Sequence, residues 1–423
     1  MKNPEKVFSR ATGNAENYRI PSLVATADDT LIAVADERFF TGADNPNRID
    51  KVVRTSTDGG ETWSEQVTAV KMTGRDKRHS SAAIDPATLY DPATDTVFML
   101  YSMTPAGIGI LNCKKGTGYA DGGIVVKKGA KSYIWKNGEL YSGSEPVGIK
   151  VDKDGNFEGG NVLTGEGGYM LYKTSYLMLT KSTDHGKTWS EPVALNPSVK
   201  DEAWHFIGSG PANGICLKNG KYAGRLVFPI YYGLGKLPMK LTAAVIYSDD
   251  GGNTWKAGAT PPIKGRYLGK KNPLIFPMRT YLTESQAVEL DNGDLLLFIR
   301  NHHPVRRIMI ARSTDGGETW SEPVFNDDLP QCVCQITALK VNYNGKSAIL
   351  TVNAGDTAKR RLGIARLSED EGKTFKKSLV ITDGEFVYSS AAQLSDGSVA
   401  LLYEDCTRHT DIKFTKFTLD ELK

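Results

Sequence analysis

Short apolar runs, paired across polar turns, recur along the whole chain. In each pair a turn such as Asn292-Gly293 separates two apolar runs, and this pattern predicts two antiparallel strands. The six pairs occupy residues 20–35, 82–103, 214–229, 285–299, 336–352 and 390–403. Their even distribution over the chain indicates a repeated β unit.

An eight-residue motif follows five of these pairs. Its pattern is Ser-x-Asp-x-Gly-x-Thr-aromatic, and it occurs at residues 56–63, 182–189, 248–255, 313–320 and 368–375. The Asp side chain can accept hydrogen bonds from nearby backbone N–H groups, and Gly supplies the positive φ of a tight turn. The aromatic residue then packs a large apolar surface beside the turn. Each copy therefore predicts a second hairpin, and five copies in one chain predict a repeat architecture.

Two hairpins per unit give four strands, and six such units predict a propeller. The sixth unit lacks the motif and ends in the apolar run Ile412–Phe417, so the early segment Lys6–Ser9 is expected to complete it. The sequence therefore predicts an all-β fold in which residues 1–423 form one six-bladed β-propeller.

One interval between Met103 and Tyr176 is too long for a hairpin loop. It is rich in Gly and Lys and contains strand-like pieces at residues 123–127, 132–135 and 139–141. Because a structureless loop of this length is unusual, we expect residues 104–175 to form a small β-rich insert in the second blade.

The predicted topology assigns the loops to two faces. The motif turns join the third and fourth strands, so they lie opposite the strand starts and the loops between the second and third strands. The insert belongs to the latter face, together with seven polar residues: Arg19, Arg38, Asp44, Glu284, Arg300, Arg360 and Tyr388. Convergent arginines are costly without an anion between them, and guanidinium groups bind carboxylates with paired hydrogen bonds. This face therefore predicts an anion site.

Composition removes several function classes. The net charge of the 423 residues is +3, which gives no support for nucleic-acid binding, and no apolar run is long enough to insert into a membrane. Residues 1–6 do not resemble a signal peptide. The pair Cys332-Val333-Cys334 is too close for a relaxed bridge and lacks partners for a metal, so we expect neither metal nor cofactor. His302-His303 and the basic run Lys264–Lys271 are expected to be solvated loops.

The repeats, together with Tyr18-Arg19-Ile20-Pro21, resemble those of the sialidase (neuraminidase) family, whose members are six-bladed propellers. Thr283-Glu284-Ser285 and Arg300 resemble the stretch with the family's catalytic glutamate and second arginine. Further similar stretches are Lys359–Gly363 for the third arginine, Gly384–Tyr388 for the catalytic tyrosine, and Ala35–Asp44 for the acid/base aspartate and an accessory arginine. Arg360 fits the pattern Arg-x-x-Gly, with Arg361 as the alternative; Asp36 and Asp50 lie near Asp44.

The resemblance implies a role for each residue. Tyr388 would be the nucleophile, because a neutral phenol avoids the repulsion that a carboxylate would meet at a carbon already bearing a carboxylate. Glu284 would take the proton of Tyr388, and Asp44 would protonate the leaving oxygen. Arg19, Arg300 and Arg360 would hold the substrate carboxylate, and Arg38 would contact a ring hydroxyl such as that at C4.

The resemblance implies an exo-α-sialidase that hydrolyses terminal sialic acids of glycoproteins, glycolipids or oligosaccharides with retention. An intramolecular trans-sialidase that releases an anhydro sugar is the alternative within this chemistry, and a non-catalytic sugar-binding propeller is the alternative outside it. Such trans-sialidases carry an aromatic ring near the site, and the absence of Trp from Cys406–His409 favours hydrolysis. Because sialylated glycans are mostly outside cells, we expect an extracellular or periplasmic bacterial enzyme. The sequence leaves the oligomeric state open.

Overall fold

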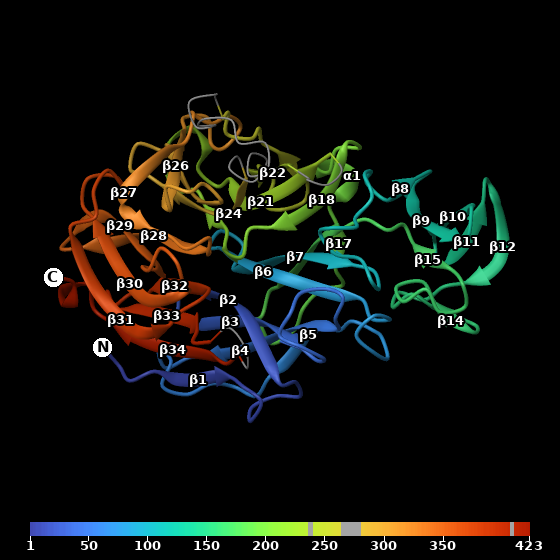
Figure 1. Ribbon diagram of the computed structural model, residues 1–423, viewed down its shortest axis with the longest axis horizontal. Coiled ribbons are helices and arrows are strands. Elements are labelled where there is room, and N and C mark those ends of the chain that lie inside the picture. Colours follow the sequence, from blue (N-terminus) through green and yellow to red (C-terminus); the bar gives the residue numbers. More distant parts are fainter. Residues whose placement is uncertain (236–239, 264–280, 407–409) are drawn as a thin grey trace.

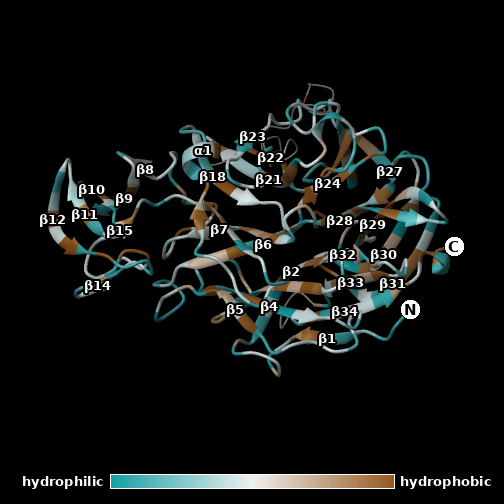
Figure 2. Ribbon diagram, turned by 180° about the vertical axis from the view of Figure 1, so that it is seen from behind, coloured by the Kyte–Doolittle hydropathy of each residue, from teal (hydrophilic) through white to brown (hydrophobic). Residues whose placement is uncertain are grey.

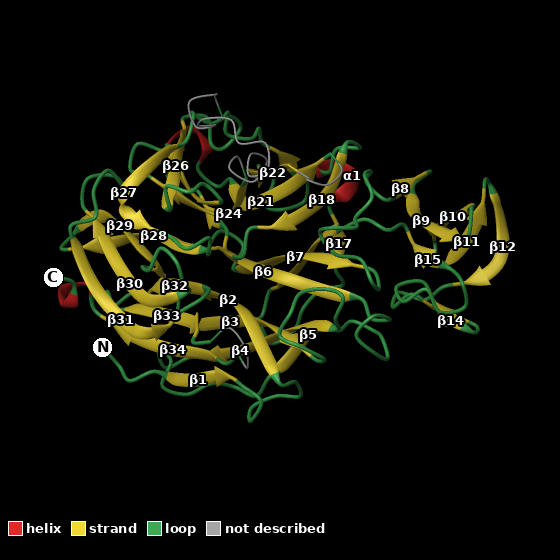
Figure 3. Cartoon of the chain, in the orientation of Figure 1, coloured by secondary structure: helices red, strands yellow, loops and turns green. Residues whose placement is uncertain are grey.

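The computed structural model describes residues 1–235, 240–263, 281–406 and 410–423. The basic run Lys264–Lys271 and residues 407–409 lie outside the described residues. Strands dominate the described residues, and the helices among them are short: α1 (Asn196–Val199), η1 (Gly220–Tyr222) and η4 (Leu419–Glu421) (Figure 3). None of these helices is long and apolar enough to cross a membrane. The all-β class predicted from the sequence is confirmed.

Four-stranded antiparallel blades follow one another around the molecule (Figure 1). The first blade contains β2 (Asn17–Ala25), β3 (Leu31–Arg38), β4 (Ile49–Ser56) and β5 (Val67–Val70). The second contains β6 (Ala82–Asp91), β7 (Thr96–Thr104), β16 (Tyr176–Ser182) and β17 (Val193–Ala194). A parallel bridge between Ile49 and Ala82 joins these two blades into one larger sheet.

The next three blades repeat the same strand order. The third contains β18 (Trp204–Ser209), β20 (Ile215–Cys216), β21 (Leu226–Leu234), β22 (Lys240–Ser248) and β23 (Lys256–Ala257). The fourth contains β24 (Leu282–Glu289), β25 (Leu295–Asn301), β26 (Arg307–Ser313) and β27 (Val324–Pro330). The fifth contains β28 (Ile336–Tyr343), β29 (Lys346–Ala354), β30 (Arg361–Ser368) and β31 (Lys377–Glu385).

The sixth blade closes the ring with the start of the chain. It contains β32 (Ser389–Gln393), β33 (Val399–Glu404), β34 (Ile412–Phe417) and β1 (Glu5–Phe8). The first strand pairs with β34 in the register Glu5↔Phe414 and Phe8↔Ile412. Six blades and the predicted closure by the N-terminal strand are therefore present in the described residues.

The third blade differs from its predicted boundaries. Its innermost strand was expected to begin at Gly214, but β18 already pairs with β21 from Trp204 onward, and β20 continues that pairing. Between them β19 (Ala212–Asn213) turns aside to pair in parallel with β6. The detour breaks the hydrophobic alternation on which the prediction relied.

The repeated motif forms the same turn in each of the five blades that contain it. In the first copy Asp58 accepts hydrogen bonds from the backbone N–H and the hydroxyl of Thr62, and Ser56 accepts one from the N–H of Gly60. A Cβ at Gly60 would lie 2.2 Å from Cζ of Phe414, so only Gly fits this close approach. The motif aromatic Trp63 packs edge-to-face against Phe414 of the neighbouring blade. The motif thus links adjacent blades. Across the molecule, hydrophobic residues are concentrated in the strands and polar residues in the loops (Figure 2).

Strand register separates the motif turns from the opposite face. Ser56, which begins the first motif, pairs with Leu31 at the start of β3, whereas Arg38 at its end pairs with Ile49. The motif turn and Arg38 are therefore at opposite ends of the blade, as the sequence predicts.

The insert forms a six-stranded sheet beside the second blade (Figure 1), and β13 and β14 pair separately as a two-stranded sheet. Its strands are β8 (Tyr119–Ala120), β9 (Gly123–Lys128), β10 (Lys131–Lys136), β11 (Glu139–Ser142), β12 (Glu145–Lys150), β13 (Asn156–Phe157), β14 (Gly160–Asn161) and β15 (Met170–Leu171). They lie between β7 and β16, so the chain leaves the propeller after Thr104 and returns at Tyr176.

Candidate active site

A cavity of about 270 Å³ opens at the end of the propeller opposite the motif turns. The innermost strands of several blades begin here, and the cavity is lined by Arg19, Ile20, Asp44, Asp85, Ile110, Tyr231, Leu241, Thr283, Glu284, Arg300, His302, Arg360 and Tyr388. Six of the seven polar residues singled out in the sequence line this cavity, although they come from distant parts of the chain.

Irregularities at the starts of three innermost strands aim side chains at the cavity. The pairing register shifts after Arg19 in β2, after Ile84 in β6 and after Leu282 in β24. Ile20 and Asp85, within two of these shifts, have φ values of 56° and 63°. A bulge leaves a residue outside the ladder and re-aims its side chain, so Asp85 and Glu284 can face the cavity.

Glu284, Tyr388 and Arg300 form a compact hydrogen-bonded group. The Tyr388 hydroxyl donates to Glu284 Oε1 at 2.5 Å, and Arg300 Nη1 donates to the Tyr388 oxygen at 2.7 Å. Arg300 Nη1 also forms an ion pair with Glu284. All three side chains are largely buried, with 8% and 13% of the Glu284 and Arg300 side chains exposed. Glu284 is therefore placed to receive the phenolic proton of Tyr388.

Burial keeps the phenol protonated in the ligand-free protein. Desolvation raises the pKa of Tyr388 well above its usual value, and the charge of Glu284 acts in the same direction, whereas Arg300 and Arg360 oppose it. The neutral phenol is thus the resting form, and positive charge beside it is available to stabilise an oxyanion.

Arg19 and Arg360 both lie near the ring of the same tyrosine. Each guanidinium carbon is 5.6 Å from the centre of the Tyr388 ring. Glu404, whose side chain is fully buried, accepts hydrogen bonds from Arg19 at 3.3 Å and from the backbone N–H of Ile20 at 2.6 Å. Glu404 thus fixes the first arginine of the group, while Arg360 Nη2 donates to the carbonyl of Val333 at 3.2 Å.

The two candidates for the third arginine are distinguished by their positions. Arg360 lines the cavity, whereas 51% of the Arg361 side chain is exposed and its Nε lies 3.7 Å from Asp356. Arg361 is the first residue of β30, where it pairs with Glu385, and it does not line the cavity. The structure therefore places Arg360, and not its neighbour, with the other two arginines.

Asp44 is the aspartate of its loop that reaches the cavity. Its side chain is 69% exposed, and Oδ1 lies 2.8 Å from Arg38 Nη1 and 3.9 Å from Arg19 Nη1. The alternatives Asp36 and Asp50 are buried in ion pairs with other residues. Although desolvation opposes the effect, Arg38 and Arg19 hold the pKa of Asp44 below its usual value.

Arg38 does not occupy the expected position. Its side chain is fully buried, and its guanidinium donates to Asp44, to the carbonyl of Gly42 and to Asp36. Asp36 in turn forms an ion pair with Lys51, which is also fully buried. Within this network Arg38 contacts Asp44 and is not among the residues that line the cavity. Its contact with a ring hydroxyl of the substrate stays a prediction.

Several cavity residues were missed by sequence reasoning. His302 lines the cavity instead of lying in a solvated loop, and burial, with the charge of Arg300, lowers its pKa to about 4. Burial and the charge of Asp44 raise the pKa of Asp85 well above its usual value, so this carboxyl can donate a hydrogen bond to a ligand. An acidic residue within an apolar strand is the signal that could have found Asp85, and likewise Glu404, which holds Arg19.

Apolar residues form one wall of the cavity. Ile110 comes from the start of the insert, and Tyr231 and Leu241 come from β21 and β22. The same residues pack around Phe206 in a hydrophobic cluster. The insert therefore contributes directly to the site, and the cavity combines a cationic side with an apolar one.

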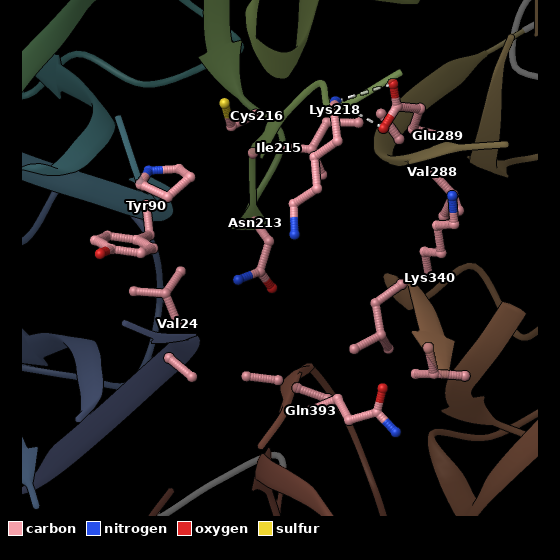
Figure 4. A pocket seen from close by; sticks show the side chains of 18 of the residues that line it. Val24, Tyr90, Asn213, Ile215, Cys216, Lys218, Val288, Glu289, Lys340 and Gln393 are labelled. Atoms are coloured by element: carbon pink, nitrogen blue, oxygen red, sulfur yellow. Dashed lines mark hydrogen bonds between the residues drawn. The ribbon is translucent and has the colours of Figure 1, made fainter. Parts of the chain in front are cut away.

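A second pocket, of about 650 Å³, lies at the far ends of the innermost strands. Figure 4 shows Asn213, Lys218 and Gln393 facing this space, while Glu289 accepts hydrogen bonds from the backbone N–H of Lys218. Asn213 is tied by its side chain to Ser390. The pocket lacks the clustered arginines and the tyrosine–glutamate pair, so the smaller cavity is the chemical candidate.

Metal ligands do not gather in the part of the chain that the structure describes. In it no group of three or more His, Cys, Asp or Glu side chains has the arrangement of a metal site.

Comparison with known proteins assigns the chain to a family. The profile of the BNR repeat-like domain matches residues 163–401, and that of the BNR/Asp-box repeat matches residues 54–65. The chain is 28% identical to the sialidase of Bacteroides fragilis over 414 residues, covering 95% of this chain and 62% of the relative. It is also 28% identical to the anhydrosialidase of Macrobdella decora over 502 residues, covering 99% and 63%.

Solved structures agree with this assignment. The intramolecular trans-sialidase of Ruminococcus gnavus, in complex with oseltamivir carboxylate, aligns with a TM-score of 0.82 at 26% identity, covering 100% of this chain and 98% of that one. The leech intramolecular trans-sialidase shares the fold, with a TM-score of 0.84 at 24% identity, and covers 100% and 71%.

The fold and the repeated turns define an Asp-box β-propeller. The chain belongs to the BNR repeat-like family and, within it, is a member of the sialidase family. It spans 63% and 62% of the lengths of the two curated relatives above.

Proposed function

We propose that this protein is an exo-α-sialidase that releases terminal sialic acids from glycans through a covalent tyrosyl intermediate. The observation that carries the proposal is the group formed by Tyr388, Glu284 and Arg300 inside a cavity that Arg19 and Arg360 also line. A cavity of about 270 Å³ suits one terminal sugar rather than a stretch of a chain.

Three arginines on one side of the cavity provide the carboxylate site. Arg19 and Arg300 are balanced by Glu404 and Glu284, whereas Arg360 has the neutral carbonyl of Val333 as a partner. A bound carboxylate would supply the negative charge that this side needs. It would also orient the anomeric carbon toward Tyr388, because the hydrogen bonds from the arginines to the carboxylate would fix the sugar ring in one position.

Tyr388 is the proposed nucleophile. Its proton would pass to Glu284 Oε1 along the existing hydrogen bond as the phenolic oxygen attacks the anomeric carbon. Arg300 Nη1, 2.7 Å from that oxygen, would stabilise the developing negative charge. A phenol that is neutral at rest can approach the substrate carboxylate without charge repulsion.

Asp44 is the proposed general acid and base. In the free protein Arg38 and Arg19 favour its ionised form. A substrate carboxylate that binds Arg19 would weaken this effect and raise the pKa of Asp44, so substrate binding itself would prepare the proton donor. Asp44 would then protonate the leaving oxygen and later remove a proton from water.

A specific similarity supports a second candidate product, the anhydro sugar. The R. gnavus structure that matches this chain over 98% of its own length is an intramolecular trans-sialidase, and the M. decora relative is an anhydrosialidase. In that reaction a hydroxyl of the bound sugar, rather than water, would attack the tyrosyl intermediate. The residues that form the intermediate would be the same.

The test is to identify both the labelled residue and the product. A fluorinated sialic acid that traps the glycosyl-enzyme should label Tyr388, and a label on Asp44 or Glu284 would contradict the mechanism. Mass analysis of the sugar released from a sialyl-galactoside separates the two products, because the anhydro sugar is lighter by one water. Absence of any released sugar would favour a non-catalytic sugar-binding propeller. Since the substrates are mostly outside cells, we also propose an extracellular or periplasmic location.

A further inference from the structure

Two cysteines lie directly behind the proposed nucleophile. Cys334 is buried and packs with Ile20, Val387 and Tyr388 in one small hydrophobic cluster, and Cys332 packs against the same cluster. Cys334 Sγ donates a hydrogen bond to the carbonyl oxygen of Val387 at 3.1 Å. The pair therefore contacts the backbone that carries the nucleophile.

The residue between the two cysteines holds the third arginine. The carbonyl of Val333 accepts a hydrogen bond from Arg360 Nη2 at 3.2 Å. Val333 has a φ of 61°, a left-handed conformation that is unfavourable for a β-branched residue. Its N–H is satisfied by the side chain of Gln331 at 3.0 Å, so the surrounding structure maintains this conformation. Any change in the Cys332–Cys334 turn would move the carbonyl that Arg360 binds.

We propose that Cys332 and Cys334 form a thiol modification site, where a small-molecule disulfide reversibly oxidises the pair and thereby weakens anion binding at Arg360. The effect on substrate rests on the function proposed above. The chemistry of the pair does not, because it depends only on the two thiols, which lie two residues apart at the same hydrophobic cluster.

Cys332 is the expected attacking group. It is half-buried, whereas Cys334 is 2% exposed. The neighbouring Cys334 thiol and Arg360 lower the pKa of Cys332, although burial opposes them. Burial raises the pKa of Cys334 well above its usual value. The accessible member of the pair is thus also the one with more thiolate.

The oxidation proceeds in two balanced exchanges. The Cys332 thiolate attacks one sulfur of the small disulfide, forms a mixed disulfide and releases one small thiolate. Cys334 then loses its proton to solvent and attacks the Cys332 sulfur, which releases the second small thiolate. Two protein thiols are oxidised to one disulfide, and one small disulfide is reduced to two thiols.

The bridge would change the site because the two sulfur atoms must move to form it. Sulfur atoms must approach to about 2.05 Å in a disulfide, so Cys334 must leave the Val387 carbonyl and the intervening peptide must rotate. The Val333 carbonyl would then move away from Arg360. A bridge across one residue is strained, and strained bridges are readily reduced, so the modification should be reversible.

The experiment treats the reduced, full-length chain with oxidised glutathione and maps thiols by mass spectrometry. In the wild type we expect the peptide with Cys332 and Cys334 to lose two hydrogens. The KM for an aryl sialoside should rise roughly tenfold or more, as for a weakened hydrogen bond to a charged group, and should recover on reduction. Cys334→Ser should give a glutathione adduct at Cys332, and Cys332→Ser should resist the reagent.

Cys216→Ser is the matched control. Cys216 is half-buried like Cys332, but it lines the second pocket, at the far ends of the innermost strands. Burial raises the pKa of Cys216 to about 11. This variant should respond to glutathione as the wild type does. The proposal is overturned if both thiols survive excess oxidised glutathione, or if the bridge forms without changing KM. Reduced protein that cleaves no sialoside would contradict the proposed function instead, and the thiol map and thermal stability would still report on the bridge.

Discussion

At the scale of single residues, charge balance distinguishes the three arginines of the cavity. Arg19 and Arg300 each contact a buried glutamate, but Arg360 donates to a neutral carbonyl. An arginine beside a neutral partner retains more attraction for an incoming anion. Arg360 is therefore expected to contribute more to substrate affinity than Arg19 or Arg300, whose charges are partly balanced by glutamates.

Substitution of the third arginine tests this assignment. Arg360→Ala should lower kcat/KM by about 30- to 1,000-fold, corresponding to roughly 2–4 kcal/mol for a lost charged hydrogen-bond pair. Arg361→Ala is the matched control and should leave kcat/KM nearly unchanged, because its side chain is half exposed and paired with Asp356. Steady-state kinetics on an aryl sialoside decide between them. The reverse pattern would mean that the neighbouring arginine binds the carboxylate.

The leaving group separates the proposed acid from the proposed nucleophile. Protonation of the leaving oxygen matters for a sugar alkoxide and matters little for a good phenolate. Asp44→Ala should therefore greatly reduce cleavage of a sialyl-galactoside but retain much of the first-step rate on an aryl sialoside. Tyr388→Phe should reduce both rates, because it removes the atom that forms the covalent bond. Equal losses for Asp44→Ala on the two substrates would exclude the acid role.

A buried histidine gives a pH dependence of stability. The pKa of His302 is about 4 in the folded protein, against 6.5 for an ordinary histidine, because burial and Arg300 disfavour its charged form. Its contribution is thus complete above about pH 6.5 and is lost as the pH falls toward 4. His302→Gln should lose less stability than the wild type between pH 7 and 4.5, by about 1–2 kcal/mol after allowance for partial exposure. Parallel melting-temperature profiles of the two proteins would contradict this assignment.

Residues within motifs could be predicted from the sequence, and residues defined by packing could not. Arg19, Glu284 and Tyr388 each lie in a recognisable local pattern, and the structure brings them together. Glu404 fixes Arg19 across 385 positions of sequence, and no local pattern records that contact. The ion pair of Arg38 with the buried Asp36 likewise became visible only in the structure.

At the scale of strands, bulges connect the regular ladder to the chemistry. Three innermost strands shift register where their side chains reach the cavity. The sequence could place the strands, since apolar alternation and turn residues are local signals. It could not place the shifts, because these depend on the contacts of neighbouring blades, as the detour of β19 toward β6 also shows.

The first strand tests how the ring is closed. Phe8 in β1 is fully buried and stacks on Tyr18 of the first blade, with ring centres 6.1 Å apart. Phe8→Ala should destabilise the protein by about 3–5 kcal/mol, because it removes a large buried ring from the joint between the last and first blades. Arg10→Ala, at a side chain that is 77% exposed, is the control and should be neutral. Thermal unfolding measures both, and an unchanged melting temperature for Phe8→Ala would mean that β1 does not hold the ring.

At the scale of the whole molecule, the insert and the propeller meet at the active site. The first residues of the insert supply Ile110 to the cavity wall, although its own sheet lies beside the ring (Figure 1). Asn45, next to Asp44, donates through its amide to Thr104 and to the carbonyl of Pro105, where the insert begins. The loop that carries the proposed acid is therefore attached to the root of the insert.

This attachment predicts a selective defect. Asn45→Ala should loosen the loop and misplace the Asp44 carboxyl, while Tyr388 and Glu284, which belong to other blades, remain in position. The variant should thus behave as a milder Asp44→Ala, with roughly tenfold or greater loss on a sialyl-galactoside and little loss on an aryl sialoside, because displacement of a catalytic group by about 1 Å can cost up to about 100-fold. The ratio of the two rates is the measurement. Thr41→Ala is the control. Thr41 lies in the same loop, and its hydroxyl accepts only an exposed hydrogen bond from the backbone N–H of Ala43, so this variant should leave the ratio unchanged. If Asn45→Ala lowers both rates equally, the insert stabilises the cavity as a whole and does not position the acid.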